Sequence, residues 1–420
     1  MSFETISVIG LGYIGLPTAA MFASRKKQVI GVDINQRAVD TINRGEIHIV
    51  EPDLDMLVSA AVQQGYLKAV TKPEPADAFL IAVPTPFKPC KEGDIPEPDL
   101  TYIKAASEAV APVLKKGDLV ILESTSPVGA TEQMSAWLAE LRPDLTFPKT
   151  HLENADVNIA HCPERVLPGH VVTELVQNDR VIGGMSKRCS ERAVELYKTF
   201  VMGECVVTNA RTAEMAKLTE NSCRDVQIAF ANELSMICDE LDIDVWELIA
   251  LANRHPRINI LQPGPGVGGH CIAVDPWFIV SKTPDLARLI KTARDVNDKK
   301  PEWVIDKVKI ALADFLQANP TKTAKNVTIA CYGLAFKPDI DDLRESPALD
   351  ITKAIADFHT GQVLAIEPNI EEIKHENFKL VTIDESLTKT DIHVMLVDHK
   401  QFKKIKLTDS FVIDSKGIWT

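Results

Sequence analysis

A single thiol follows a glycine-rich run in segment 262–276. Cys271 comes after four glycines and two prolines, and the carboxylate of Asp275 follows four residues later. Backbone without side chains can lie against a ligand, and a cysteine at the start of a helical stretch has its thiolate stabilised by the helix dipole. Cys271 is therefore a candidate nucleophile. The alternative is that it is one more buried structural thiol.

A second candidate site is the glycine-rich turn Gly10-Leu11-Gly12-Tyr13-Ile14-Gly15. It follows the apolar run 6–9, precedes a helical pattern over 16–24, and is followed eighteen residues after Gly15 by Asp33, which ends the next apolar run. In this context Gly10 permits a tight turn, Gly12 lets the backbone approach a pyrophosphate, and Gly15 lets a helix pack on a strand.

This turn predicts a bound NAD. A carboxylate at the end of the second strand favours a ribose diol over a 2′-phosphate, so NAD is expected rather than NADP. The residues expected to hold the cofactor here are Gly10, Gly12, Tyr13, Ile14, Gly15 and Asp33. The alternative is a glycine turn of an ordinary α/β sheet.

Small polar residues follow two further predicted strands. Thr85 lies in the sequence VPTP and Thr125 in ESTSPVG. Ligands of open parallel sheets lie over the carboxyl ends of the strands, so both threonines are expected to face the cofactor. For either residue, a local turn or a helix N-cap is the alternative.

A thiol beside a nicotinamide permits one particular chemistry. The thiolate can add to an aldehyde to give a thiohemiacetal, which gives up a hydride, and an oriented water can then hydrolyse the resulting thioester. An alcohol can thus be oxidised to an acid within one site.

The elements that must position these residues alternate between short apolar runs and helical patterns. In the first half the predicted strands are 5–9, 28–32, 78–83, 119–123, 158–161, 180–182 and 204–207. This rhythm is typical of a doubly wound parallel sheet. A long helix is predicted over 213–239, a stretch without Gly or Pro. It is apolar on more than one side, as expected of a helix buried between domains and subunits, and it predicts a homodimer.

A second, smaller α/β domain is predicted from residue 326. Its expected strands are 326–331, 362–366, 393–397 and 411–414, with a helix over 346–358. We therefore expect an α/β protein with two Rossmann-like, doubly wound parallel-sheet domains joined by a central helical domain. The expected boundaries are 1–210, 211–316 and 317–420, with the polar stretch 317–325 as the linker.

The composition excludes several classes of protein. The 420 residues include 46 Lys and Arg against 59 Asp and Glu, a formal net charge of -13, which disfavours a nonspecific nucleic-acid binder. The N-terminal apolar run is interrupted by glycines and prolines, so neither a signal peptide nor a membrane helix is expected, and the cytoplasm is the expected compartment. The eight cysteines show no metal-ligand spacing. We expect no metal, and most of these thiols reduced and buried.

Further motifs cover nearly the whole chain. They are CPER at 162–165, EMAKLTEN at 214–221, GVGGHCIAVDP at 266–276 and GLAFKPDIDDLRESP at 333–347. With the N-terminal GLGYIGLP, they make the chain resemble the UDP-glucose/GDP-mannose dehydrogenase family. Members of this family oxidise the C6 alcohol of a nucleotide sugar to a uronic acid with two NAD, so the resemblance implies that activity, with UDP held by the C-terminal domain.

The resemblance also implies catalytic roles. Cys271 matches the nucleophile, Lys217 and Asn221 match the pair that stabilises the oxyanion, Asp275 and Thr125 match the couple that orients water, and Glu164 matches the glutamate that assists thioester hydrolysis. The spacing of Lys217 and Asn221 independently puts them on one helix face. Taken alone, such a pair is usually a solvated surface.

Binding roles follow in the same way. Lys337 matches a lysine that contacts the UDP-sugar, Arg344 an arginine that contacts the cofactor, and Arg257 a substrate arginine that reaches across a dimer. The other residues that the resemblance assigns to the substrate are Arg165, Val166, Lys217, Asn221, Arg224, His255 and Gly268.

Departures from the usual pattern narrow the expected substrate. His270 precedes the cysteine, Ile272, Ala273 and Val274 follow it, and Arg224 and Asp225 stand where small apolar residues are common. These features are similar to the branch that acts on UDP-N-acetylhexosamines. Within that branch, the N-terminal stretch and segment 254–257 most resemble the enzymes that act on UDP-N-acetyl-D-mannosamine. The resemblance therefore implies this substrate, the source of a uronic acid of enterobacterial common antigen.

Three alternatives stay open at this point. The substrate could be another UDP-hexose, either UDP-N-acetylglucosamine or UDP-glucose. The chain could be a two-electron dehydrogenase of hydroxy acids, which needs neither the thiol nor the second α/β domain. It could also be an NAD-binding regulator without catalysis.

Overall fold

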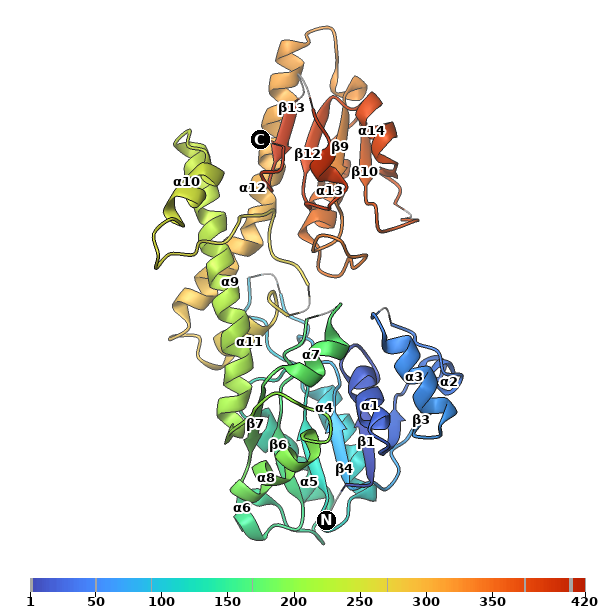
Figure 1. Cartoon of the computed structure of the whole chain (residues 1–420). Helices are drawn as coiled ribbons and strands as arrows, with labels where there is room; N and C mark the ends of the chain where they lie inside the picture. The colour runs from blue at the N-terminus through green and yellow to red at the C-terminus, as the bar shows by residue number, and fades with distance from the viewer. Residues whose placement is uncertain are drawn as a thin grey trace. The chain divides into compact units, whose positions relative to one another are not determined.

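The computed structural model describes residues 3–49, 51–91, 93–167, 169–269, 271–373, 375–407 and 411–419. The chain divides into two compact units (Figure 1). Unit 1 comprises residues 1–220 and 277–283, and unit 2 comprises residues 221–276 and 284–420.

Unit 1 is built on one sheet of eight strands. The strands are β1 (Thr5–Ile9), β2 (Gln28–Val32), β3 (Leu67–Val70), β4 (Ala78–Ile81), β5 (Leu119–Leu122), β6 (Asn158–His161), β7 (Arg180–Gly184) and β8 (Cys205–Asn209). Their spatial order is β3-β2-β1-β4-β5-β6-β7-β8. The order reverses between β1 and β4, which is where doubly wound sheets open a crevice for ligands.

One pair of strands in this sheet is antiparallel. Strands β6 and β7 are antiparallel, with Ala160 opposite Gly184 and His161 opposite Gly183, while the other neighbouring pairs are parallel. Strand β7 begins at the same end of the sheet at which β6 finishes, because the segment between them does not cross back to the other end. The predicted doubly wound parallel sheet is thus confirmed except at this pair, which places Arg180 beside the end of β6.

Helices cover both faces of this sheet. The helices along this part of the chain are α1 (Gly15–Ser24), α2 (Gln36–Asn43), α3 (Leu54–Gln63), α4 (Thr101–Val110), α5 (Ala130–Leu141), α6 (Pro148–His151), α7 (Val171–Gln177) and α8 (Lys187–Tyr197). Buried side chains of α1, α3, α7 and α8 join one core, and those of α4 and α5 join another. In β5, Leu119 and Ile121 face the first core while Val120 and Leu122 face the second. Burial on both faces explains why these strands read as continuous apolar runs.

The long helix α9 (Ala210–Glu240) begins in unit 1 and ends in unit 2. The predicted helix over 213–239 is confirmed, and the observed helix begins three residues earlier and ends one residue later. The following helices are α10 (Val245–Ala252), α11 (Asp275–Lys282) and α12 (Arg288–Ala318). The sequence analysis did not predict α12, which contains Pro301. Because this helix extends to Ala318, the first two residues of the predicted linker belong to it.

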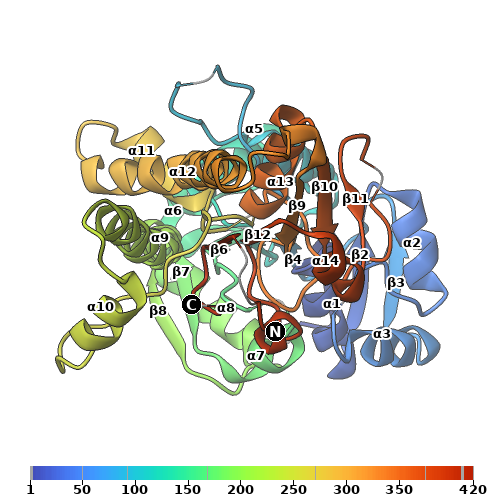
Figure 2. The same cartoon turned by 90° about the horizontal axis from the view of Figure 1, so that it is seen from above.

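Unit 2 contains a second sheet of five parallel strands. The elements of this part are β9 (Thr328–Tyr332), α13 (Pro347–Phe358), β10 (Gln362–Ile366), β11 (Lys379–Leu380), α14 (Ile383–Lys389), β12 (Ile392–Met395) and β13 (Phe411–Asp414). The order is β11-β10-β9-β12-β13. Helices α12 and α13 lie side by side (Figure 2), and their buried side chains join one core with residues of β9, β10 and β12. The predicted second Rossmann-like domain is confirmed.

Short 3-10 turns complete the described structure. They are Ala111–Val113, Leu152–Asn154, Ala324–Asn326 and Phe402–Lys404. Among the described residues, no helix combines the length and apolar character that a membrane span requires. All eight cysteines carry free thiols, but only Cys162, Cys189, Cys238 and Cys331 are buried, so the prediction that most would be buried is met by half of them.

Candidate active site

The N-terminal glycine turn has the geometry of a dinucleotide site. Gly10 has a φ of 92°, and a Cβ there would lie 2.4 Å from the carbonyl oxygen of Ala82. A Cβ on Gly15 would lie 1.7 Å from the carbonyl oxygen of Gly10. A Cβ on Gly12 would meet nothing within 4 Å, so this position faces open space. The first and third glycines close the turn, and the second leaves room for a ligand.

The carboxylate of Asp33 is tied to the same turn. Its Oδ2 accepts the N–H of Leu11 at 2.9 Å, and its Oδ1 accepts the N–H of Asn35 at 2.9 Å. Both contacts hold the acid beside the glycines at the end of β2, where it can accept hydrogen bonds from a ribose diol. Tyr13 is 40% exposed and Ile14 is half-buried at the start of α1. These residues fit the adenosine part of NAD.

Thr85 lies beyond the end of β4, across the switch point from Gly10. The residue is half-buried, and its Oγ1 is buried without a hydrogen-bond partner in the described structure. A buried hydroxyl without a partner is costly, so a ligand polar group is the expected complement. This orphaned atom supports the prediction that Thr85 faces the cofactor.

Thr125 and Glu164 follow neighbouring strands. Leu122 at the end of β5 pairs with His161 at the end of β6, and Thr125 and Glu164 each come three residues later. Both therefore lie at the same edge of the sheet. Thr125 is half-buried, while Glu164 is 8% exposed and bonded to Arg180.

A glutamate of α9 holds the loop that carries Thr125. Oε2 of Glu214 accepts the N–H of Gly129 at 2.6 Å, and Oε1 accepts the N–H and the hydroxyl of Thr131 at 2.8 and 2.6 Å. Burial raises the pKa of Glu214, and these hydrogen bonds oppose that rise. The carboxylate caps the N-terminus of α5, whose own cap residue, Gly129, has no side chain.

Cys271 is exposed in the structure, which makes it accessible to a substrate. Its carbonyl accepts the N–H groups of Val274 and Asp275 at 3.2 and 2.9 Å, and regular helix begins at Asp275. The predicted helical start after Cys271 is thus a helical turn ahead of α11. His270, its predicted neighbour, lies outside the described residues.

The glycines before Cys271 lie against another segment of unit 2. A Cβ on Gly268 would lie 2.3 Å from the carbonyl oxygen of Glu345, and one on Gly269 would lie 2.8 Å from the ring of Phe336. A Cβ on Gly266 would lie 2.9 Å from Pro347. The sequence analysis interpreted these glycines as making room for a ligand. The structure shows that they let the thiol loop pack against segment 333–347, which carries Lys337.

Asn221 and Asp275 are brought together within unit 2. Nδ2 of Asn221 donates to Oδ2 of Asp275 at 2.5 Å, and the carboxylate is 3% exposed. An amide nitrogen has two hydrogens, so Asn221 keeps a second donor for a substrate oxygen. Lys217 lies four residues earlier on α9 and is half-buried.

The turn that follows β9 in the second sheet is similar to the glycine turn that follows β1. Gly333 has a φ of 91°, and a Cβ there would lie 2.3 Å from the side chain of Val397. Oε2 of Glu367, directly after β10, accepts the N–H groups of Leu334 and Ala335 at 2.8 and 3.0 Å. Burial would raise the pKa of Glu367, but the hydrogen bonds from His399 and from these two N–H groups lower it. A rigid turn thus leads into the loop that carries Lys337.

The other predicted binding residues differ in their surroundings. Both Arg165 and Arg344 are held by acids of their own unit, Arg165 by Glu220 at 2.7 Å and Arg344 by Asp342 at 2.6 Å. Val166 packs against the core of unit 1, which gives it a structural role as well. Arg224, His255 and Arg257 are exposed.

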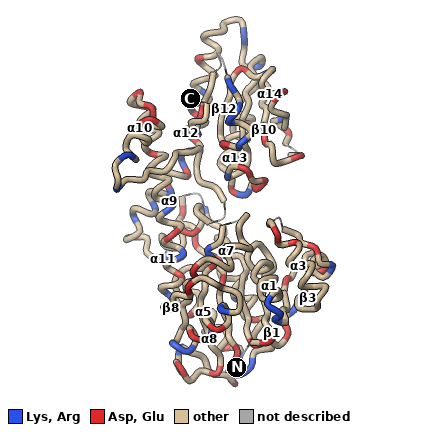
Figure 3. Tube along the Cα trace, viewed as in Figure 1, with Lys and Arg blue, Asp and Glu red and all other residues tan. Residues whose placement is uncertain are grey.

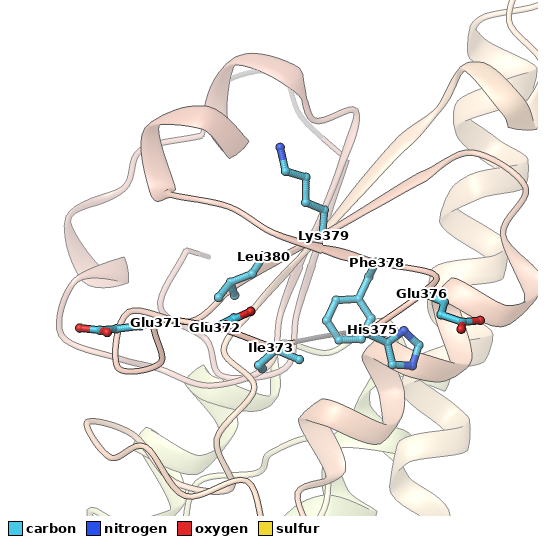
Figure 4. Close-up of a pocket in the computed structure, with 8 residues that line it drawn as sticks. All are labelled: Glu371, Glu372, Ile373, His375, Glu376, Phe378, Lys379 and Leu380. Atoms are coloured by element: carbon cyan, nitrogen blue, oxygen red, sulfur yellow. The ribbon is translucent and has the colours of Figure 1, made fainter.

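A hollow of about 640 Å³ in unit 2 is lined by none of these residues (Figure 4). It is lined by Glu371, Glu372, Ile373, His375, Glu376, Phe378, Lys379 and Leu380. None of its lining residues was predicted to bind or react. The ring of His375 stacks on Phe378 at 4.3 Å, which accounts for that histidine structurally.

Charges and possible metal ligands were also located. Lys and Arg are interspersed with Asp and Glu along the trace (Figure 3), unlike the dense positive surface that nonspecific nucleic-acid binding requires. Within the described ranges, no three His, Cys, Asp or Glu side chains gather as a metal site.

The sequence matches one protein family over most of its length. Residues 4–201 match the NAD binding domain of the UDP-glucose/GDP-mannose dehydrogenase family, residues 211–299 its central domain, and residues 330–420 its UDP binding domain. The chain belongs to this family. It is an NAD-dependent UDP-sugar dehydrogenase, with NAD as its cofactor.

Individual relatives are similar over the full length. A UDP-N-acetyl-D-mannosamine dehydrogenase from Yersinia pestis is 69% identical, with all of both chains covered. An NDP-N-acetyl-D-galactosaminuronic acid dehydrogenase from Ralstonia nicotianae is 62% identical, covering all of this chain and 97% of the relative. A solved UDP-D-ManNAc dehydrogenase from Pyrococcus horikoshii is 37% identical, with a TM-score of 0.85, and covers 99% of this chain and 96% of that one.

Sequence reasoning missed four residues that hold the candidate site in place. Arg180 donates to Glu164, Glu123 lies near Arg180, Glu214 caps α5, and Glu367 holds the turn before Lys337. Glu214 could have been found as the first letter of EMAKLTEN, and Glu367 as the acid ending a strand in the manner of Asp33. No sequence signal pairs Arg180 with Glu164, because that pairing depends on the antiparallel β7.

Proposed function

We propose that the chain oxidises the C6 alcohol of UDP-N-acetyl-D-mannosamine to UDP-N-acetyl-D-mannosaminuronate, acting in the cytoplasm through a covalent intermediate on Cys271. The observation that carries the proposal is an exposed Cys271 whose loop packs on the segment that contains Lys337. The chain is also 69% identical to a UDP-N-acetyl-D-mannosamine dehydrogenase from Yersinia pestis. The uronic acid would serve the synthesis of enterobacterial common antigen.

Each part of the chain has a proposed task. Residues 1–210 hold NAD, residues 211–316 supply the catalytic helix and the dimer contact, and residues 317–420 hold the UDP-sugar. The family ranges 4–201, 211–299 and 330–420 support this division. In the N-terminal part the turn residues, Asp33, Thr85 and Thr125 hold the cofactor, with Arg344 as a further contact. When bound there, NAD accepts the hydride that each oxidation releases from C6.

In the first oxidation, the chain's own residues stabilise charge at C6. Lys217 and the second Nδ2 hydrogen of Asn221 donate to the C6 oxygen while C6 loses a hydride to NAD and the hydroxyl loses its proton to solvent, which gives the aldehyde. The thiolate of Cys271 then bonds to C6 as the π pair of the carbonyl moves to oxygen, and protonation of that oxygen gives a thiohemiacetal. Loss of a second hydride to NAD and of the hydroxyl proton leaves a thioester on the same sulfur.

Hydrolysis completes the reaction. Asp275, Thr125 and Glu164 orient a water molecule, its oxygen bonds to C6, and the bond between C6 and sulfur breaks. The carboxylate leaves with the UDP moiety, and the thiol is restored. Arg165, Val166, Gly268, Arg224, His255 and Lys337 are proposed to hold the nucleotide sugar, joined by Arg257 from a second subunit.

A homodimer is part of the proposal. Six large apolar side chains along α9, α10 and the turn between them are exposed: Met215 (38%), Phe230 (52%), Ile237 (46%), Leu241 (62%), Ile243 (46%) and Leu251 (58%). Exposed apolar residues so close in the chain are typical of an interface. Light scattering at assay concentration should give twice the chain mass, and a single-chain mass would contradict the dimer.

The substrate is tested with a panel of UDP-sugars scored by NADH yield. UDP-N-acetylmannosamine should give the highest kcat/KM and two NADH per sugar, since an alcohol becomes an acid by loss of two hydrides. The Ralstonia relative favours N-acetylgalactosamine as the second candidate. Preference for that sugar, for N-acetylglucosamine or for glucose would overturn the assignment. A yield of one NADH per sugar would indicate a two-electron dehydrogenase. If no sugar gave NADH, the chain would be an NAD-binding regulator.

A further inference from the structure

A buried arginine lies against the candidate hydrolytic glutamate. Arg180, the first residue of β7, is 5% exposed, and its Nη2 donates to Oε2 of Glu164 at 2.8 Å. Oε1 of Glu164 accepts the N–H of Arg165 at 2.7 Å. Each carboxylate oxygen is therefore held by its own donor, which fixes the orientation of the group and leaves lone pairs for a further donor.

The guanidinium is itself held in place. It lies 4.6 Å from the ring centre of Tyr197 and 5.6 Å from that of Phe200, and its Nη1 lies 3.6 Å from Sγ of Cys162. Arginine stays charged in proteins and stacks on aromatic faces, so it suits a buried ion pair of this kind. The antiparallel pairing of β7 with β6 brings it here.

A second carboxylate shares the cluster. Oε1 of Glu123 is 3.9 Å from Nη1 of Arg180 and accepts the hydroxyl of Tyr197 at 2.5 Å. Burial raises the pKa of Glu123 to about 7; Arg180 opposes this rise and the charge of Glu164 adds to it. Glu123 therefore holds a proton below about pH 7, and Glu164 is the carboxylate that accepts the direct hydrogen bond from Arg180.

We infer that Arg180 is a positioning residue that holds Glu164 as an oriented carboxylate for thioester hydrolysis, with Glu123 as the acid that balances the cluster. The inference rests on the proposed function. In the step concerned, a water oxygen bonds to C6 while a proton of that water passes to Glu164. The electron pair of the bond between C6 and sulfur leaves with Sγ of Cys271, and no redox change occurs.

The charged and titratable groups around Arg180 come from every element packed on it. They are Glu123 after β5, Cys162 and Glu164 after β6, Asp179 before β7, Tyr197 on α8 and Cys205 on β8. Of the residues that the structure describes, only the two glutamates lie within ion-pair range of the guanidinium, so they dominate the response to a substitution.

Arg180→Met tests the inference, because it removes the charge and keeps an unbranched apolar side chain between the rings. Glu164 then loses its counter-charge and the hydrogen bond that orients its Oε2. Hydrolysis should slow by about 100-fold while both oxidations proceed, a size typical of losing one acid or base group. A rapid burst of NADH should precede a slow steady state, intact-mass measurement should show the sugar acid bound to the enzyme, and KM for the UDP-sugar should not rise.

Three companion variants separate positioning from general damage. Glu164→Gln should give the same burst and adduct, and combining it with Arg180→Met should cause no further loss. Arg180→Lys should recover part of the hydrolysis rate. Arg192→Met, the control in the same unit, removes an arginine that pairs with Glu195 and lies 4.1 Å from the ring of Phe3, and it should leave the rates unchanged.

The pH profile gives a readout that also works if Arg180→Met fails to fold. The acidic limb of kcat should move to higher pH in Arg180→Lys, which pairs less well with Glu164. It should stay in place in Glu123→Gln, because Glu123 already carries its proton below about pH 7 in the parent. An unmoved limb in Arg180→Lys would overturn the inference. So would a folded Arg180→Met enzyme that turns over within about threefold of the parent, or one that slows with no adduct. If the parent itself oxidises no UDP-sugar, the proposed function fails instead.

Discussion

The glycine turn allows the structural and binding roles of two neighbouring glycines to be separated. A methyl group at Gly12 would meet nothing within 4 Å, whereas one at Gly15 would lie 1.7 Å from the carbonyl oxygen of Gly10. Gly12→Ala should therefore change the free energy of unfolding by no more than about 0.5 kcal/mol. Gly15→Ala should destabilise unit 1 by about 3 kcal/mol or more, because the backbone of the turn must move.

Gly12→Ala should lose affinity for NAD although it keeps its stability. In Gly12→Ala the new methyl occupies the space where the backbone approaches the pyrophosphate. Losing one hydrogen bond to a charged phosphate costs about 1.5–3 kcal/mol, or roughly 10–150-fold in Kd. Calorimetric titration with NAD measures this loss directly, and thermal unfolding with and without NAD checks the fold.

A matched control is available in the same protein. Binding of UDP, which we assign to unit 2, should be unchanged in Gly12→Ala. The reasoning would be refuted if Gly12→Ala bound NAD within about threefold of the parent, or if it destabilised the protein as much as Gly15→Ala does.

Three further predictions concern buried charges. Arg294→Met removes the guanidinium whose Nη1 lies 2.6 Å from Oδ1 of the fully buried Asp225. It should lower the free energy of unfolding by about 3–5 kcal/mol, because it leaves a buried carboxylate without its counter-charge. Denaturant titration measures this loss, and a value below about 1 kcal/mol would contradict the prediction. Glu123→Gln tests the link between this pKa and stability, because a pKa raised from 4.5 to about 7 means that folding favours the protonated acid. As pH rises from 4.5 to 7, the parent should lose up to about 3 kcal/mol of unfolding free energy relative to the variant. Parallel curves of stability against pH for parent and variant would refute this. Glu214→Ala removes the cap of α5 and should cost about 1–3 kcal/mol and lower kcat through the Thr125 loop; an unchanged melting temperature would count against it.

Much of the fold could be predicted because apolar periodicity reports burial. Strands β1, β2, β6, β10 and β13 begin and end where the runs predicted them. The short edge strands β3 and β11 were missed, since edge strands need fewer apolar residues. Helix α12 was missed because Pro301 argues against a continuous helix, although buried Val304, Val308 and Phe315 keep it packed.

The candidate site could be predicted in its residue types but not in its supports. Glycine spacing identified the NAD turn, and the thiol stood out by its neighbours. The contacts of Gly268 and Gly269 with Phe336 and Glu345 join segments far apart in sequence, and no local pattern encodes them. The pairing of Arg180 with Glu164 likewise depends on strand direction, which apolar spacing does not specify.

The central claim is that the substrate carbon becomes bonded to the sulfur of Cys271. The most direct measurement is the yield of NADH and of uronic acid from UDP-N-acetylmannosamine with Cys271→Ala. The account predicts no uronic acid and at most one NADH per sugar, because oxidation stops at the aldehyde. Two NADH per sugar at the parent rate would contradict it.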